Sequence, residues 1–158
     1  MGSYGYEGRA RALQDVSLTI PKGSVVALVG LSGCGKSTTA SLLMRFCDAA
    51  AGHIYMDGKD YHSMKPEELR KHIAMVPQQV NLFSGTIREN LLLADPDADD
   101  QTLMEAVKEA GLLKFVQSLE KGLNSDVGNA GASLSGGQRQ KIGIARALLS
   151  KAEYMILD

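Results

Sequence analysis

Residues 25–39 read VVALVGLSGCGKSTT, a β-prone apolar run followed by a glycine-rich loop and the start of a helical pattern. The loop at 30–37 matches G-x-x-x-x-G-K-[ST] in full, and the expected strand and helix flank it. Its three glycines let the backbone turn sharply and bring N–H groups close to phosphate oxygens. The stretch therefore predicts a phosphate-binding loop in an α/β protein.

The side chains of this loop suit a nucleotide. Lys36 offers a positive charge to the outer phosphates, and the Ser37 hydroxyl is a hard oxygen ligand for Mg²⁺. Cys34 is interpreted as a small residue tolerated at a variable loop position, with a redox-sensitive thiol as the alternative. The residues that we expect to contact the nucleotide here are Gly30, Leu31, Ser32, Gly33, Cys34, Gly35, Lys36, Ser37 and Thr38.

Composition narrows the function classes. The chain has 158 residues, 44% of them hydrophobic and 22% charged, which is typical of one soluble globular domain. A net charge of -1 gives no basic footprint for nucleic acid, so we expect no nucleic-acid partner. The longest apolar runs, 25–29 and 154–157, are too short to insert into a bilayer. Two cysteines indicate no disulfide framework and fit a reducing cytosolic setting.

Hydrophobic periodicity predicts an alternation of strands and helices. Expected strands are 16–20, 25–29, 54–56, 73–76 and 154–157, of which 25–29, 73–76 and 154–157 read as buried. Expected helices are 36–46, 66–70, one capped by Asp99 or Asp100 and ended by Gly111, then 112–121 and 135–150. This order predicts an α/β fold with a parallel sheet, into which the stretch 87–131 inserts helices.

Residues 134–138 read LSGGQ, the second informative motif. Ser135 and Gln138 have the S-x-x-Q spacing of a capping box, which predicts a helix start. A cap alone does not need two glycines, so Gly136 and Gly137 indicate a further use of this helix end. Free N–H groups and the positive end of the helix dipole would point outward there.

With the phosphate loop upstream, LSGGQ followed by RQKIGIARAL at 139–148 resembles the nucleotide-binding domain of an ATP-binding cassette (ABC) transporter. The resemblance runs from about Tyr6 to Asp158. Residues 76–90, VPQQVNLFSGTIREN, resemble the glutamine loop and its sequel in the exporter branch. Residues 154–158, YMILD, resemble the Walker B strand.

This resemblance implies a P-loop NTPase (ABC ATPase) core with a parallel sheet, an N-terminal antiparallel β part and a helical insertion. It implies one domain, 1–158, with a catalytic core at 1–86 and 132–158 and a helical subdomain at 87–131. In the family, the strand that follows the Walker B strand lies between the Walker B strand and the strand that precedes the phosphate loop. Since 158 is the last residue, we expect this C-terminal strand to be missing and the fold to be only marginally stable. The gap between the two remaining strands would be closed by direct pairing of these strands, by a partner chain or by a swapped dimer.

The resemblance also implies site roles. Lys36, Gln78 and Asp158 would be catalytic, and Ser37, Gln78 and Asp158 would hold Mg²⁺. Gln78 is preferred to Gln79 because it directly follows Val-Pro, as in the family pattern. Tyr6, with Tyr4 as a competitor, would stack on adenine.

In this family the signature acts across a dimer, so Ser135, Gly136, Gly137 and Gln138 would face the nucleotide bound by a second, head-to-tail subunit. The implied cofactors are ATP and Mg²⁺. The implied partner is the transmembrane domain of an exporter, which places this chain at the cytoplasmic face of the cell membrane.

The chain departs from the family pattern at several places. Gly128-Asn129 stands where exporters usually carry Gly-Glu, and Gly143 replaces a usual Ala, which we expect to weaken the signature helix by roughly 1 kcal/mol. The catalytic Glu would directly follow Asp158, and a switch histidine would come later. His53, His62 and His72 all precede the signature and read as surface polar residues. We therefore expect this chain to bind MgATP but to hydrolyse it poorly.

Two alternatives remain open. The chain could be a nucleotide-binding module without activity. A DNA-maintenance ATPase also combines both motifs but inserts a long coiled coil, whereas only 97 positions (37 to 133) separate Lys36 from Leu134. A GTPase is disfavoured because no N-K-x-D motif follows the phosphate loop.

Overall fold

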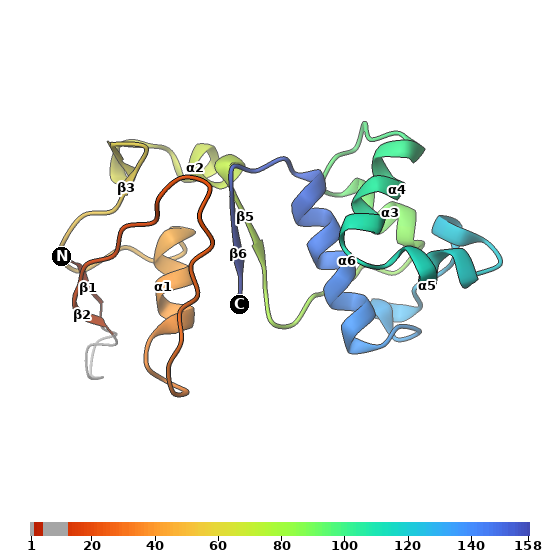
Figure 1. The fold of residues 1–158 in the computed structure, drawn as a ribbon, viewed down its shortest axis with the longest axis horizontal. Helices are drawn as coiled ribbons and strands as arrows, with labels where there is room; N and C mark the ends of the chain where they lie inside the picture. Colours follow the sequence, from red (N-terminus) through yellow and green to blue (C-terminus); the bar gives the residue numbers. More distant parts are fainter. Residues whose placement is uncertain (1, 5–12) are drawn as a thin grey trace. The chain divides into compact units, whose positions relative to one another are not determined.

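The computed structural model describes residues 2–4 and 13–158 (Figure 1). The chain forms two compact units, Met1–Arg70 (unit 1) and Lys71–Asp158 (unit 2). The expected subdomain boundaries near 87 and 131 stay a prediction. Tyr6 lies outside the described residues.

Unit 1 combines short antiparallel strand pairs with one longer helix. β1 pairs with β2 and β3 pairs with β4, both antiparallel, as expected for the N-terminal part. The elements in chain order are β1 (Gly2–Tyr4), β2 (Leu13–Val16), α1 (Lys36–Leu43), β3 (Tyr55–Met56), β4 (Lys59–Asp60), η1 (Tyr61–Ser63) and α2 (Pro66–His72), which runs on into unit 2.

Two strand predictions for unit 1 are wrong. β2 ends at Val16, so the stretch 17–20 is irregular rather than a half-buried strand. The run 25–29 is neither a strand nor buried: Val25 is 99% exposed and Val29 is 92% exposed. No segment of the described residues forms a ladder with this run. Apolar, β-branched residues favour a strand, but the strand exists only where a neighbour accepts and donates its backbone hydrogen bonds.

The helix after the phosphate loop ends three residues before the expected position. Arg45, two residues past Leu43, has a left-handed backbone with φ 51. The Phe46 N–H donates to the Ser41 carbonyl at 2.9 Å, which closes the helix end in the manner of a Schellman motif. Ala40, Leu42 and Met44 are the buried apolar residues of this segment.

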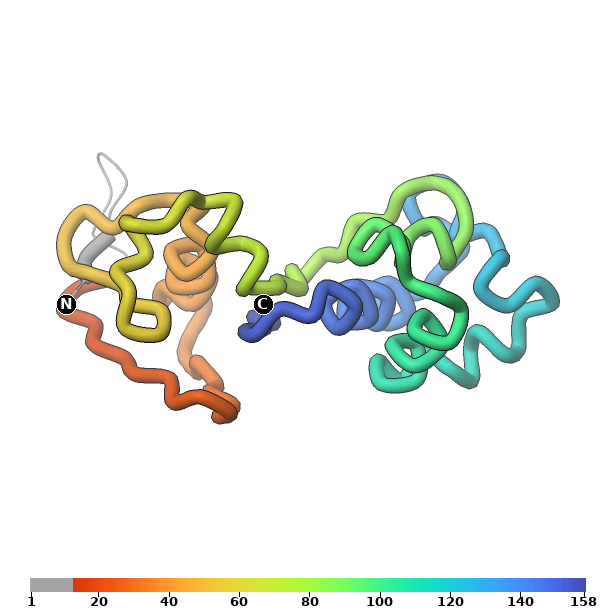
Figure 2. The backbone as a smooth tube through the Cα atoms, turned by 90° about the horizontal axis from the view of Figure 1, so that it is seen from above, coloured from red at the N-terminus to blue at the C-terminus, as the bar shows by residue number. Residues whose placement is uncertain are grey.

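Unit 2 contains the parallel pair that the sequence predicts. β5 (Ile73–Val76) and β6 (Tyr154–Leu157) run parallel, in a register from Ile73↔Tyr154 to Val76↔Leu157. Figures 1 and 2 show the two strands side by side, with the C-terminus at their end. The other elements are α3 (Ile87–Leu92), α4 (Asp100–Glu109), α5 (Leu113–Ser118), η2 (Gly122–Asn124), η3 (Asn129–Gly131) and α6 (Gly136–Leu149).

The core of unit 2 forms where α6 packs against α3 and α4 (Figure 2). The signature helix contributes Ile142 and Ala145, both 0% exposed. The stretch 87–131 contributes most of the remaining fully buried side chains, among them Ile87, Leu91, Leu103, Val107, Leu112 and Val116. The insertion and the signature helix therefore share one hydrophobic core.

Helix ends in unit 2 follow local sequence signals. Asp99 caps α4 by accepting the Thr102 N–H at 2.8 Å, and Gly111 after the helix has φ +70. α5 is shorter than the predicted 112–121, because the backbone at Leu119 is already extended.

The prediction of a fully buried strand at 154–157 is wrong. Met155 is 42% exposed and Leu157 is 66% exposed, while the alternate residues are half-buried. Because the exposed residues alternate with half-buried ones, one face of the strand lacks cover. Among the described residues β5 is the only ladder neighbour of β6, so one edge is also open.

Candidate functional site

The glycines of the phosphate loop are required by the backbone geometry. Gly33 (φ 82) and Gly35 (φ 98) both have left-handed conformations, which a side chain would strain. A Cβ on Gly30 would lie 2.6 Å from the Cys34 Sγ, so a side chain there would clash. Gly35 is also the N-cap of α1, which places the loop at the positive end of a helix.

Lys36 folds back over this loop. Its Nζ donates to the carbonyl oxygens of Gly30 at 2.8 Å and Leu31 at 3.0 Å, and lies 3.7 Å from the Cys34 Sγ. The Cys34 N–H donates to the Leu31 carbonyl at 3.2 Å, which closes a turn inside the loop. The ammonium charge is thereby held at the loop that the sequence predicts to bind phosphate.

The remaining loop residues surround the first turn of α1. Ser32 and Ser37 are exposed, Leu31 is 86% exposed, and Thr38 is half-buried. The Thr39 hydroxyl donates to the Gly35 carbonyl at 3.0 Å and so ties the helix to the loop. All nine predicted loop residues are thus contiguous with one helix N-terminus, as the sequence indicates.

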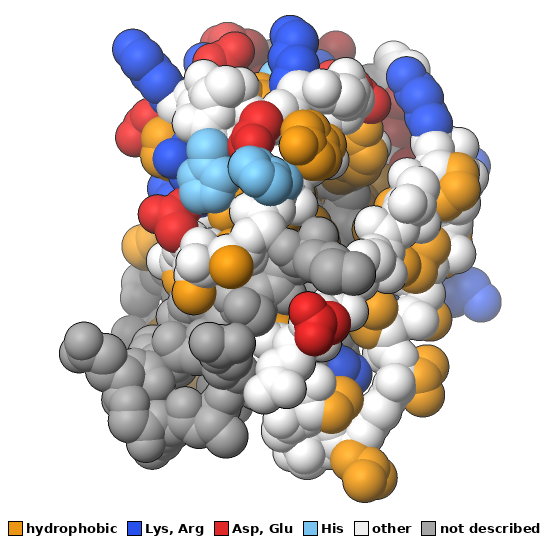
Figure 3. All heavy atoms as spheres, turned by 90° about the vertical axis from the view of Figure 1, so that its left-hand side faces the viewer, with side chains coloured by type: hydrophobic (Ala, Val, Ile, Leu, Met, Phe, Trp, Pro, Cys, Tyr) orange, Lys and Arg blue, Asp and Glu red, His pale blue; other side chains and the backbone are white. Residues whose placement is uncertain are grey.

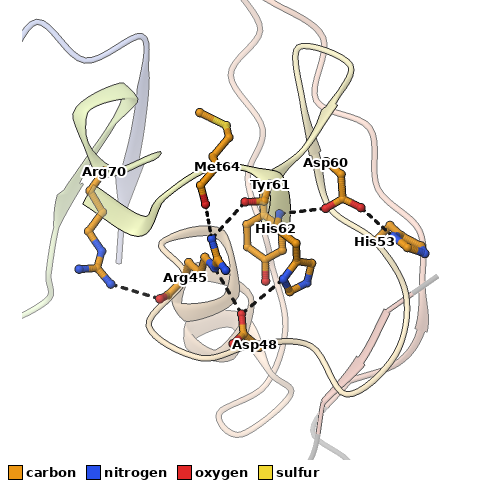
Figure 4. A network of polar contacts seen from close by, with 8 residues as sticks. All are labelled: Arg45, Asp48, His53, Asp60, Tyr61, His62, Met64 and Arg70. Carbon is orange, nitrogen blue, oxygen red and sulfur yellow. Dashed lines mark hydrogen bonds and ion pairs between the residues drawn. The ribbon is translucent and has the colours of Figure 1, made fainter. Parts of the chain in front are cut away.

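Two arginines that the sequence did not single out hold the other end of α1 (Figure 4). Arg45 donates to the carbonyl oxygens of Met64 and Tyr61, and its guanidinium carbon lies 5.5 Å from the centre of the Tyr61 ring. Arg70 donates to the carbonyls of Met44 at 3.3 Å and Arg45 at 3.2 Å. The helix that begins at the phosphate loop is therefore fixed at its far end by contacts up to 26 residues away.

The side chains of the three histidines are solvent-accessible, as predicted, and each lies beside a carboxylate. Figure 3 shows histidine side chains beside acidic side chains on one face of the molecule. His53 Nδ1 lies 2.9 Å from Asp60 Oδ2, and the His62 N–H donates to Asp60 Oδ1 at 2.9 Å. Hydrogen bonds to its carboxylate hold the pKa of Asp60 below its usual value, with the backbone N–H of His62 contributing most and the His53 side chain next. In unit 2, His72 Nδ1 lies 2.9 Å from Glu153 Oε1.

The signature helix begins with the predicted capping box. The Gln138 N–H donates to Ser135 Oγ at 3.2 Å, and the Ser135 N–H donates to Gln138 Oε1 at 2.8 Å. Gly136 and Gly137 are exposed, and a Cβ on Gly137 would meet nothing within 4 Å. Packing within this chain therefore does not explain Gly137, which keeps this helix end open to close approach from outside.

Gln78 and Asp158 lie beyond the carboxyl ends of the paired strands β5 and β6. The Asp158 N–H donates to the Val76 carbonyl at 3.0 Å, which extends the ladder by one step. Gln78 and Gln79 both follow Pro77 and both are exposed, so the geometry does not separate them. Ligands of parallel α/β sheets bind at this end of the strands, so the structure brings two predicted site residues to the appropriate edge.

Four further polar residues of unit 2 were not found by sequence reasoning. Thr86 and Glu89 form a second capping box at α3, which their T-x-x-E spacing signals. Buried Asn90 and half-buried Arg146 form a hydrogen-bonded pair, and because 56 residues separate them, no local signal reveals it.

Among residues 2–4 and 13–158, none of the helices combines the length and the apolar character needed to cross a bilayer.

Comparison with known proteins identifies the family. A family model described as "ABC transporter" matches residues 13–158. The chain is 46% identical to the "ABC-type transporter kk1G" of Curvularia clavata over 99% of the chain and 12% of that protein. It is 47% identical to the "ATP-dependent lipid A-core flippase" of Haemophilus ducreyi over 98% of the chain and 27% of that protein.

A solved structure of an ABC exporter is similar to nearly the whole chain. The "Structure of a bacterial Atm1-family ABC exporter with ATP bound" matches with a TM-score of 0.94 and 36% identity, over 99% of this chain and 27% of that one. The α/β P-loop class predicted from the sequence is thereby confirmed. The chain spans about an eighth to a quarter of the length of the curated relatives it matches. With a family model covering nearly all of its residues, the chain belongs to the ABC transporter family.

Proposed function

We propose that this chain is the nucleotide-binding domain of an ABC exporter, and that it binds MgATP at residues 30–38. The observation that supports the proposal is the phosphate loop, in which two glycines have left-handed backbones and the Lys36 ammonium lies on the loop carbonyls. Backbone N–H groups and a fixed cation at a helix N-terminus form an anion site. In the whole protein, ATP hydrolysis would power transport across the membrane.

Mg²⁺ fits the oxygen donors that the chain offers. The Ser37 hydroxyl, the Gln78 amide oxygen and the Asp158 carboxylate are hard oxygen ligands, and all three residues are exposed. Together with phosphate oxygens they would hold the ion, which neutralises charge on the phosphates when bound. The catalytic set is Lys36, Gln78 and Asp158, and Tyr6 remains the proposed adenine contact.

The signature serves a second nucleotide-binding domain in this proposal. Gly136 and Gly137 are exposed at the N-terminus of α6, where free N–H groups and the helix dipole favour an anion. A head-to-tail dimer would bring Ser135, Gly136, Gly137 and Gln138 to the γ-phosphate held by the partner. The transmembrane domain of the exporter would be the other partner, which places this domain at the cytoplasmic face of the membrane.

We further infer that hydrolysis uses a general base that directly follows Asp158 in the family pattern. The alternative, a nucleotide-binding module without any activity, predicts the same binding of MgATP but no hydrolysis by a version that continues past Asp158.

A nucleotide titration tests the proposal. Calorimetry with MgATP is carried out on the chain, on the longer version, and on Lys36→Ala and Lys22→Ala variants of each. We expect Lys36→Ala to abolish detectable binding and Lys22→Ala, another exposed lysine of unit 1, to change the affinity less than twofold. Circular dichroism confirms that the variants are folded. Equal binding by Lys36→Ala and the unmodified chain would contradict the proposal.

Phosphate release then separates the two forms of the proposal. We expect steady turnover from the longer version. Binding without turnover in that version would favour the module without activity.

A further inference from the structure

Asn90 is the one buried polar or charged side chain of the described residues, with 1% of its surface exposed. Its Oδ1 accepts the Phe83 N–H at 2.9 Å and also an N–H from the Nη2 of Arg146. Its Nδ2 donates to the carbonyls of Phe83 and Thr86, each at 2.9 Å. An amide side chain offers two donors and two acceptor sites, so Asn90 uses its full hydrogen-bonding capacity.

Arg146 brings a charge into this buried site. Its Nε donates to the Asn90 carbonyl at 2.7 Å, and its Nη1 donates to the Asn81 carbonyl at 3.0 Å. The acceptors of these three hydrogen bonds are all neutral oxygens, so the guanidinium is held by carbonyl and amide dipoles. Burial lowers the pKa of Arg146, in keeping with a cation removed from water. A half-buried cation held in this way is geometrically demanding, because each oxygen that moves away leaves a donor unpaired.

These hydrogen bonds connect two functional segments. Asn81, Phe83 and Thr86 belong to the segment 81–86, which follows Gln78 by three residues. Arg146 lies on α6, the helix that begins after Ser135. Phe83 is 67% exposed, so its backbone hydrogen bonds to Asn90, rather than burial of its ring, hold it in place.

We propose that Asn90 and Arg146 are positioning residues that fasten the segment 81–86 to the signature helix, so that Gln78 and Ser135 are carried by one rigid body. Neither residue need touch nucleotide. The proposal rests on the proposed function only in its expected effect on turnover. Its structural half, that the pair holds the segment 81–86 in place, can be measured by hydrogen exchange without nucleotide.

Arg88 supplies a matched control. It lies on α3 like Asn90, and its guanidinium makes as many hydrogen bonds as that of Arg146, to Asn124 Oδ1 and to both carboxylate oxygens of Asp100. None of these partners belongs to the segment 81–86. The Arg88→Ala variant therefore measures how a general loss of helix contacts affects unit 2.

The experiment compares Asn90→Ala, Arg146→Lys and Arg88→Ala in the longer version that continues past Asp158. Arg146→Lys keeps the charge but cannot reach three oxygens at once, so it tests geometry in a protein that still folds. We measure kcat, KM for MgATP, and hydrogen exchange of the Phe83 amide. For Asn90→Ala and Arg146→Lys we expect kcat to fall at least tenfold, KM to stay within twofold, and Phe83 exchange to rise at least tenfold. Arg88→Ala should change each quantity less than twofold.

Several results would overturn the inference. Phe83 exchange that stays unchanged in a folded Asn90→Ala or Arg146→Lys variant would show that the pair does not hold the segment. Faster exchange with unchanged kcat would show that holding it does not matter for turnover, and an equal loss in Arg88→Ala would show a general packing effect. If the unmodified protein bound no MgATP, the proposed function would fail, while the exchange comparison would still decide the structural half.

Discussion

Gly143 on the signature helix lies against the side chain of Val80. A Cβ added to Gly143 would be 2.6 Å from Val80 Cγ2 and 3.3 Å from Val76 Cγ1. The sequence suggested only that this glycine weakens the helix, because alanine is the better helix former. The structure shows a reason to keep it: the chain that leaves β5 packs directly on the helix backbone at this point.

Gly143→Ala should therefore fail to stabilise the protein. The gain in helix propensity is about 1 kcal/mol, whereas overpacking a filled site costs about 1–3 kcal/mol. Val80 is β-branched and has few rotamers with which to move aside. We expect a net loss of about 1 kcal/mol in the free energy of unfolding, measured by urea denaturation.

A double-mutant cycle checks the cause. In a Val80→Ala background the clash is removed, so Gly143→Ala should become neutral or stabilising there. Additive effects of the two substitutions would contradict the contact as the reason.

The two capping boxes should contribute similar stability. Ser135→Ala and Thr86→Ala each remove a side-chain oxygen that accepts the N–H of the third helical residue, Gln138 or Glu89. Each should lower the free energy of unfolding by about 1 kcal/mol. Sedimentation of the longer version with MgATP then separates their roles, since only Ser135→Ala should also weaken nucleotide-driven association. Equal association by both variants would argue against Ser135 as a contact across the dimer.

Acid should weaken unit 2 partly through Glu89. Its carboxylate accepts the N–H and the hydroxyl of Thr86, the N–H contributing most, and these bonds hold the pKa of Glu89 below its ordinary 4.5. Because the folded-state pKa is lowered, the stabilisation is complete above about pH 4.5 and is lost as pH falls below it. Urea denaturation at several pH values between about 5 and 3 should give a shallower pH dependence for Glu89→Gln. Parallel curves for the two proteins would refute this.

Two residues with left-handed backbones should respond oppositely to glycine. Arg45 (φ 51) and Lys151 (φ 54) both bear the strain of a side chain in this region, which glycine relieves. The exposed side chain of Lys151 forms an ion pair with Asp95, which contributes little, so Lys151→Gly should gain up to about 1 kcal/mol in stability.

The side chain of Arg45, 17% exposed, contacts Met64, Tyr61 and Asp48 (Figure 4). Arg45→Gly should therefore lose about 2 kcal/mol, the scale of buried hydrogen bonds to a charged group. Thermal melting of both variants provides the check, and stabilisation of the protein by Arg45→Gly would show that strain outweighs these contacts.

Features that depend on residues three to five positions apart were predictable from the sequence. The phosphate loop, the capping box of Ser135 and Gln138, the Asp99 cap and the Gly111 helix end all appear where the pattern places them. In each case the donor, the acceptor and the backbone conformation belong to one short segment, so the local sequence contains the whole interaction.

The tertiary structure alone decided what distant segments do to one another. The run 25–29 has the composition of a buried strand, yet it is exposed, because a ladder needs a second segment that composition cannot specify. Three contacts join residues that lie 26 to 63 positions apart in the sequence. They are the packing of Gly143 against Val80, the hydrogen bond from Arg70 to Met44 at the end of α1, and the Asn90–Arg146 pair. Such contacts depend on how the hydrophobic faces pack, which brings together side chains that no spacing along the chain relates.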